Sequence, residues 1–104
     1  MASDKDRTDG AVKERVRVQK REPTEYMVVL LNDDYTTMDF VVHVLEAVFN
    51  LPEDQAIQIM LNVHVKGIGV AGVYTYEVAE MKVAKTTAMA REQEFPLLCT
   101  IENA

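Results

Sequence analysis

The sequence predicts an α+β domain in which helices pack against a three-stranded antiparallel sheet. An apolar run that ends in a polar turn predicts the first strand, and apolar residues at helical spacing predict the two helices after it. A strand-helix-strand pattern then completes the order β-α-α-β-α-β. The chain has 104 residues, 48% of them hydrophobic, which suits one domain, and we expect that domain to span residues 24–104.

Residues 25–31 predict the central strand. Their nearly uninterrupted apolar and β-branched character is typical of a strand buried on both faces. Asn32-Asp33-Asp34 follows as a turn, because short polar side chains can hydrogen-bond their own backbone. Thr36, with Asp39 three residues later, fits the capping box of a helix. The expected apolar face of this helix consists of Met38, Val41, Val42, Leu45, Val48 and Phe49.

The rest of the chain predicts two more helices and two more strands. The second helix runs from about Glu53 to Val65, with Pro52 in its first turn and Gly67 as a left-handed C-cap. A strand follows over 68–74, and Thr75 can cap a third helix to about Glu92. The last strand, 97–101, is joined to the second through a helix. These two strands are therefore expected to be parallel, with the first strand between them and antiparallel to both.

Residues 1–23 form a separate segment by composition. The first 22 residues hold seven Lys/Arg, five Asp/Glu and no aromatic residue, and Pro23 follows them. Such a segment lacks the apolar surface that folding requires, so we expect a disordered N-terminal tail. On composition alone, a purely solubilising extension accounts for it equally well.

Charge and hydropathy narrow the class of protein. Residues 23–104 carry four Lys/Arg and twelve Asp/Glu, so we expect neither nucleic acid nor anionic lipid as a partner. No apolar run approaches the roughly 20 residues of a membrane span, and the N-terminus has no secretory-signal pattern. The lone Cys99 has no partner for an internal disulfide. We therefore expect a cytoplasmic protein.

The common catalytic motifs are absent from the sequence. It contains no Gly-rich phosphate loop, no Cys pair, no His-x-x-x-His and no Gly-x-Ser-x-Gly. With one Cys and two His, a nucleophile with its base and orienting group is difficult to assemble. We expect a protein that is not an enzyme and needs no cofactor or metal.

Two polar groups remain as candidates for a site: the Asn32-Asp33-Asp34 turn and His64. An Asp pair before a helix is most often a turn or cap, and a histidine among apolar residues is most often a core residue. If the two groups meet, they offer amide, carboxylate and imidazole acceptors. That set suits an ammonium group, which has three donors and no acceptor. A metal ion would accept the same atoms, so spacing alone leaves both ligands open.

Four segments resemble the ClpS family of protease adaptors. They are residues 29–41, 60–67, 72–83 and 96–102, and they occur in the family's order over most of 25–104. The resemblance implies an adaptor that binds proteins by a free N-terminal Phe, Tyr, Trp or Leu, an N-degron. It also implies delivery of these proteins to the N-terminal domain of a ClpA-type AAA+ unfoldase, which works with the ClpP peptidase. The tail would assist that transfer.

The resemblance also assigns residues by motif position. Asn32, Asp34 and His64 would hold the α-amino group, with Asp33 supporting the loop. Glu77 and Lys82 would contact ClpA. The pocket for the first side chain would be lined by Thr36, Met38, Met60, Val63 and Leu97.

One departure from the family pattern and two rival hypotheses stay open. Thr37 stands where the family commonly has proline, which leaves the range of accepted side chains undetermined. The first rival is a metal-dependent hydrolase built on Asp33, Asp34 and His64. The second is a docking domain like the C-terminal domain of the ribosomal stalk protein, which has the same order of elements.

Overall fold

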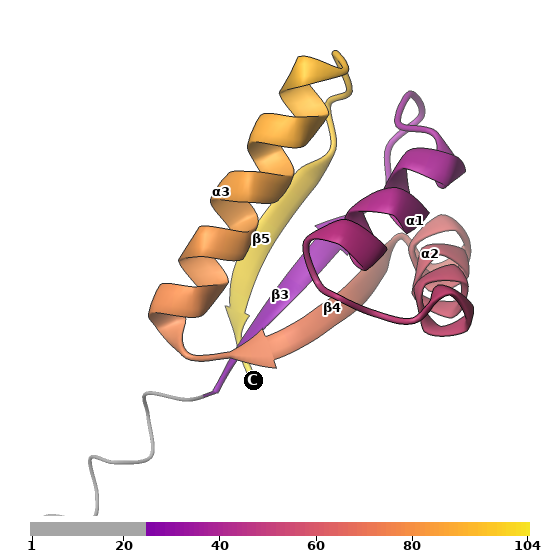
Figure 1. Cartoon of the computed structure of the whole chain (residues 1–104). Coiled ribbons are helices and arrows are strands. Elements are labelled where there is room, and N and C mark those ends of the chain that lie inside the picture. Colours follow the sequence, from indigo (N-terminus) through magenta and orange to yellow (C-terminus); the bar gives the residue numbers. More distant parts are fainter. Residues whose placement is uncertain (1–24) are drawn as a thin grey trace, which may run out of the picture.

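A computed structural model describes residues 25–104 and shows the predicted order of elements (Figure 1). The prediction of a disordered tail at 1–23 lies outside the described residues. The elements are β3 (Tyr26–Leu31), α1 (Met38–Ala47), α2 (Glu53–Lys66), β4 (Ile68–Tyr74), α3 (Tyr76–Glu92) and β5 (Leu98–Asn103).

The sheet of the described residues has the strand order β4-β3-β5, with β3 antiparallel to both neighbours. The predicted central position of β3 is therefore confirmed, and β4 and β5 run parallel. Val28, Val29 and Leu30 are at most 2% exposed; Val28 and Leu30 belong to the core cluster, whereas Val29 points to the opposite face of the sheet. A bulge lies opposite the Val28–Val29 step, because Val28 pairs with Gly72 and Val29 pairs with Val70.

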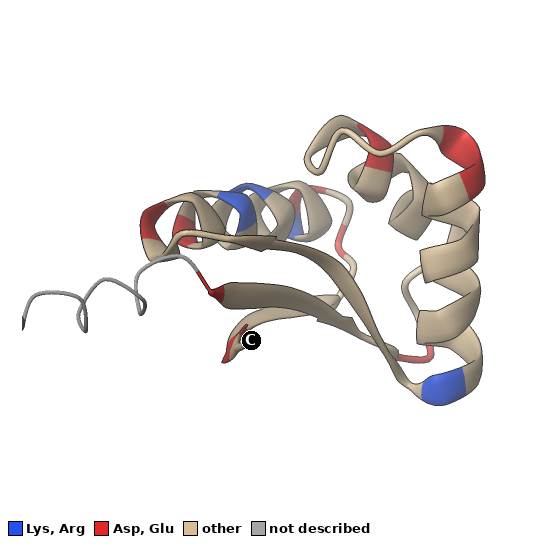
Figure 2. Cartoon of the chain, turned by 90° about the horizontal axis from the view of Figure 1, so that it is seen from below, with Lys and Arg blue, Asp and Glu red and all other residues tan. Residues whose placement is uncertain are grey.

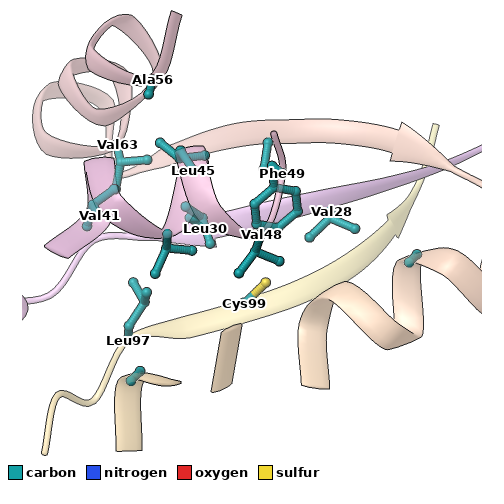
Figure 3. Packing of buried hydrophobic residues seen from close by; sticks show 14 residues of the cluster. Val28, Leu30, Val41, Leu45, Val48, Phe49, Ala56, Val63, Leu97 and Cys99 are labelled. Atoms are coloured by element: carbon teal, nitrogen blue, oxygen red, sulfur yellow. The ribbon is translucent and has the colours of Figure 1, made fainter. Parts of the chain in front are cut away.

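The hydrophobic core lies between one face of the sheet and helices α1 and α3, while α2 stands crosswise at one end of the strands (Figures 1 and 2). Leu30, Leu45 and Leu97 are its largest fully buried side chains (Figure 3). Each such side chain contributes about 1.5–3 kcal/mol by its removal from water. The predicted apolar face is correct at Val41 and Leu45 on α1 and at Val48 and Phe49 just after it, but Val44 is fully buried as well and Met38 is 48% exposed.

The helix ends agree with the prediction at two positions and differ at two. Gly67 is the left-handed C-cap of α2 with φ 88°, and Thr75 caps α3 by accepting a hydrogen bond from the N–H of Val78. The predicted capping box at Thr36 is wrong, because Thr37 is the N-cap of α1 and accepts from the N–H of Phe40 at 3.1 Å. Pro52 is the N-cap of α2 and lies just outside its first turn.

Acidic side chains outnumber basic ones in the described part as a whole, and the few Lys and Arg lie mainly on α3 (Figure 2). No helix within 25–104 combines the length and the apolarity that crossing a bilayer requires.

Candidate functional site

A cavity of about 360 Å³ opens between the loop after β3 and helix α2. The loop and the start of α1 form one wall, and the C-terminal half of α2 forms the other. The lining residues are Asn32, Asp33, Asp34, Tyr35, Thr36, Thr37, Met38, Val41, Met60, Val63 and His64. The acidic turn and His64, which are about 30 residues apart in the sequence, therefore share one cavity.

Two backbone features hold α2 next to the loop. The N–H of Asn32 donates to the carbonyl of Gly67, the C-cap of α2, at 2.9 Å. Gly69 lets β4 approach α2 closely, since a Cβ there would lie 2.7 Å from Cγ2 of Val63 and 3.2 Å from the carbonyl of Ile59. The last turn of α2, which carries His64, is thereby fixed beside the end of β3.

Asp33 organises the loop from within. Its Oδ1 accepts from the N–H groups of Tyr35 at 2.8 Å and Thr36 at 2.7 Å, and its Oδ2 accepts from the Thr36 hydroxyl at 2.8 Å. Partial burial acts to raise the pKa of Asp33. The hydrogen bonds from Thr36 and Tyr35, with the charge of Arg91, outweigh that effect and hold the pKa below its usual value near 3.8. Because Thr36 is engaged by Asp33, the role of helix cap passes to Thr37.

The rim of the cavity is polar and accessible. Asn32, Asp34 and His64 are all exposed, and no described residue makes a hydrogen bond to their side chains. The interpretation of His64 as a buried core histidine is therefore wrong. These three side chains present an amide oxygen, a carboxylate and an imidazole nitrogen to whatever enters the cavity.

The interior of the cavity is apolar. Val41 and Val63 are 6% and 3% exposed, and Met60 is half-buried. Met38 lies at the start of α1 and lines the cavity with 48% of its surface exposed. It is therefore not part of the buried face of α1 to which its spacing assigned it. The arrangement can bind a cation at its rim and, next to it, an apolar group attached to that cation.

Three residues that line the cavity were not among the predicted site residues: Tyr35, Thr37 and Val41. Tyr35 and Thr37 follow the acidic turn directly, so their position in the chain was the available signal. Val41 follows Met38 by three residues and therefore shares its helical face. Its apolar spacing assigned it to the core, and the structure places it on the wall between core and cavity.

Leu97 is not among the lining residues. It is 1% exposed and belongs to the buried cluster with Leu30 and Cys99 (Figure 3). Leu97 and Cys99 are buried while Leu98 between them is 54% exposed, which is the alternation of an edge strand with one face on the core.

The two predicted unfoldase contacts differ in their surroundings on α3. Glu77 is exposed in the first turn. Lys82 is half-buried, and its Nζ donates to the carbonyl of Val48 at 2.8 Å. The same ammonium lies 5.7 Å from the ring centroid of Phe49 and 5.3 Å from that of Tyr74. Lys82 therefore links α3 to the C-terminal end of α1.

The hydrolase hypothesis requires a cluster of metal-binding side chains. Within 25–104 no three His, Cys, Asp or Glu side chains are grouped closely enough to hold a metal ion. Asp33, Asp34 and His64 line one cavity but do not converge as a three-ligand set, and Asp33 already accepts three hydrogen bonds. The geometry therefore does not support this rival.

Known proteins resemble the chain over most of its length. The family model described as ATP-dependent Clp protease adaptor protein ClpS matches residues 21–100. A protein of Hyphomonas neptunium named ATP-dependent Clp protease adapter protein ClpS is 52% identical over 100 residues, which cover 96% of this chain and 85% of that protein. The protein of the same name from Xanthomonas oryzae pv. oryzae is 55% identical over 95 residues, which cover 91% and 90%.

A solved structure extends the similarity to three dimensions. The structure of Agrobacterium tumefaciens ClpS2 bound to L-phenylalaninamide matches with a TM-score of 0.76 and 41% identity, covering 79% of this chain and 99% of that one. The relatives of this chain in sequence are thus named adaptor proteins, and this chain shares its fold with the solved structure of Agrobacterium ClpS2. The chain belongs to the ClpS family of ATP-dependent Clp protease adaptor proteins.

Proposed function

We propose that this protein binds other proteins through a free N-terminal Phe, Tyr, Trp or Leu and delivers them to the ClpA–ClpP AAA+ protease. It acts in the cytoplasm as an adaptor, not an enzyme, and uses no cofactor. The observation that carries the proposal is the single cavity whose rim is formed by Asn32, Asp34 and His64 and whose interior is apolar.

The rim fits an N-terminal ammonium group. A free α-amino group has a pKa near 7.7–8.0 and is mostly charged at neutral pH. Its three donors match the acceptors of Asn32, Asp34 and His64, while Asp33 holds the loop in shape. The ligand named for the Agrobacterium relative, L-phenylalaninamide, has this amine, a benzyl side chain and an amide in place of the next peptide bond. It therefore resembles an N-terminal phenylalanine, which supports the proposal.

The interior fits the first side chain. Thr36, Met38, Met60 and Val63 line it, and Leu97 supports the core nearby. Burying a Leu or Phe side chain contributes about 1.5–3 kcal/mol, and each hydrogen bond to the charged amine contributes about 1.5–3 kcal/mol. After the loss of rigid-body freedom, about micromolar affinity remains. That affinity suits an adaptor that must release its substrate.

Two substitutions test the amine site. We expect Asp34→Ala and His64→Ala each to weaken binding of a Phe-initial peptide at least tenfold in a fluorescence anisotropy titration, because each removes an acceptor of the charged amine. Matched controls are Glu80→Ala and His43→Ala, which remove an exposed carboxylate and an exposed imidazole outside the cavity. Unchanged affinity in the Asp34 and His64 variants, with thermal melts like the parent's, would reject the assignment.

The ligand offers a second test. An acetylated N-terminus has no charge and fewer donors, and it leaves rim acceptors without partners, so we expect binding to fall below detection. A Gly-initial peptide leaves the apolar interior empty and should also bind poorly. A docking domain of the ribosomal stalk type would ignore all of these peptides, so equal response to all of them would favour that rival.

The delivery step is assigned to the surface of α3 around Glu77 and Lys82. Glu77 is the cleaner probe, because Lys82 also contacts α1 inside the molecule. We expect Glu77→Lys to keep Phe-peptide affinity but to reduce binding to the N-terminal domain of ClpA and to slow degradation of a Phe-initial substrate by ClpA–ClpP. Glu92→Lys, at the other end of the same helix, is the control. Full degradation by the Glu77 variant would contradict the assigned surface.

A further inference from the structure

We propose that a second groove, beside the first cavity, binds a large apolar or aromatic side chain that follows the first residue of the same bound protein. This downstream groove is lined by Tyr35, Arg91, Glu94, Phe95 and Pro96 and has a volume of about 520 Å³. The inference rests on the proposed function, because the occupant is the chain whose amine is held by the first cavity.

Tyr35 joins the two sites. Among residues 25–104 it is the one that lines both the first cavity and the downstream groove. Its side chain is 76% exposed, while its backbone N–H is fixed by Asp33 at 2.8 Å. Tyr35 is therefore shared by the two hollows, and a bound chain that leaves the first cavity past Tyr35 reaches the groove within a few residues.

The far wall of the groove is preformed. The Nη1 atom of Arg91 donates to the carbonyls of Phe95 at 2.7 Å and Leu97 at 3.2 Å, and the N–H of Phe95 donates to the carbonyl of Ala90 at 2.8 Å. The ring of Phe95 also packs edge-on against Phe40, with centroids 5.0 Å apart. Little ordering is needed when a ligand arrives, which favours binding.

The lining selects by shape and apolarity. Tyr35, Phe95 and Pro96 supply three rings, and aromatic pairs stabilise each other beyond simple burial. Arg91 and Glu94 carry opposite charges, so the groove has no net charge with which to select a charged side chain. The guanidinium of Arg91 adds a cation that can face an incoming ring. The occupant is therefore an aromatic or large aliphatic side chain.

A peptide scan with the full chain tests the inference. The reference is a fluorescent peptide that begins with phenylalanine and continues only with serine and glycine; four further peptides place one tryptophan at the second, third, fourth or fifth position. We expect one of these positions to raise affinity about threefold to tenfold, the range of an added aromatic contact. Equal affinity for all five peptides would overturn the inference.

A pair of proline variants locates the gain. Pro96→Glu puts a charged chain into the groove at an exposed position, whereas Pro52→Glu makes the same change at an exposed position outside both hollows. We expect Pro96→Glu to abolish the tryptophan gain while binding the reference peptide as the parent does, and Pro52→Glu to keep both. A gain that persists in Pro96→Glu would place the tryptophan elsewhere and overturn the inference.

An NMR measurement tests the groove without any substitution, and binding of the reference peptide separates failure of the groove from failure of the proposed function. Amide NMR signals of Glu94 and Phe95 in the unsubstituted protein should shift with the tryptophan peptide and not with the reference, and this needs no variant to fold. If the two peptides caused the same shifts at Glu94 and Phe95, the proposal that the groove binds a downstream side chain would also be overturned. If the reference peptide itself fails to bind, the proposed function is rejected and the groove with it, whereas reference binding without a tryptophan gain rejects the groove alone.

Discussion

At the scale of single residues, Asp33 and Asp34 show how neighbouring identical side chains take different roles. Asp33 accepts three hydrogen bonds from Tyr35 and Thr36 and shapes the loop. Asp34 is exposed on the cavity rim and accepts none from any described residue. The first is therefore expected to matter for stability and the second for ligand binding.

Asp33 makes stability depend on pH. Its pKa is lowered in the folded protein, so its contribution is complete above the unfolded value near 3.8 and is lost as the pH falls through the lower folded value. We expect Asp33→Ala to reduce the free energy of unfolding by about 1 kcal/mol at pH 7, as for loss of an exposed side-chain cap. Urea unfolding should show this difference shrinking towards pH 3. Asp34→Ala serves as the control, with stability unchanged at pH 7.

Thr86 is a buried polar residue with a testable cost. It is 0% exposed on α3, and its hydroxyl has no hydrogen-bond partner among the residues that the structure describes. The nearby Cys99 is a weak polar neighbour: burial raises the pKa of its thiol to about 11, and the Thr86 hydroxyl acts in the opposite direction. We expect Thr86→Val to raise the free energy of unfolding by about 1 kcal/mol, because valine has nearly the same shape without the unsatisfied hydroxyl. Thr87→Val should change it little, and a destabilised Thr86 variant in thermal and urea melts would contradict this account.

At the scale of elements, α1 carries part of the site at its N-terminal end and is anchored at both ends. Thr37 caps its start, beside Met38 at the cavity mouth. Just beyond its other end, the carbonyl of Val48 accepts a hydrogen bond from Lys82 of α3. A cation at a helix C-terminus also interacts favourably with the helix dipole. The helix that presents the loop to a ligand is thus tied to the helix that is proposed to meet the unfoldase.

Lys82 should therefore affect stability as well as delivery. We expect Lys82→Met to lower the free energy of unfolding by about 1–2 kcal/mol, since it removes a charged donor from a helix-end carbonyl and a cation from two aromatic rings. Lys85→Met, an exposed position one turn along the same helix, should have little effect. Equal urea midpoints for the two variants would show that Lys82 contributes nothing to the fold.

At the scale of the whole molecule, the sheet brings distant segments to one place. The end of β3 and the end of α2 meet through the Asn32–Gly67 hydrogen bond, although 35 positions separate them in the chain. The connection between α3 and β5 lies at the same end and supplies the downstream groove. Both hollows consequently lie beside the loop that follows β3.

The proposed division into a tail and a domain gives a prediction for the intact molecule. We expect deletion of residues 1–22 to leave Phe-peptide affinity unchanged, because within the described part of the chain the residues that line the cavity all lie between 32 and 64. Degradation of a Phe-initial substrate by ClpA–ClpP should become slower, because the tail is proposed to engage the unfoldase. A truncated protein that supports degradation at the parent rate would leave the tail a solubilising role only.

Much of the architecture follows from local patterns. The apolar run of 25–31, the helical spacing after it and the caps at Gly67 and Thr75 are short-range signals, so element types and order were predictable. Errors occurred where a tertiary contact competes with a local one. Thr36 has the spacing of a cap, but its backbone N–H and its hydroxyl both donate to Asp33.

By itself the sequence determined which chemical groups are present: an acidic turn after an apolar strand and a histidine next to apolar helix residues. The family resemblance assigned both groups to one binding site. Only the tertiary structure decided that these groups share a cavity and that Tyr35 opens onto a second groove. The physical reason is that the apolar spacing that predicts helices and strands depends only on residues close together in the sequence. The approach of α2 to β3 depends on contacts between segments far apart, such as the space that Gly69 leaves beside Val63.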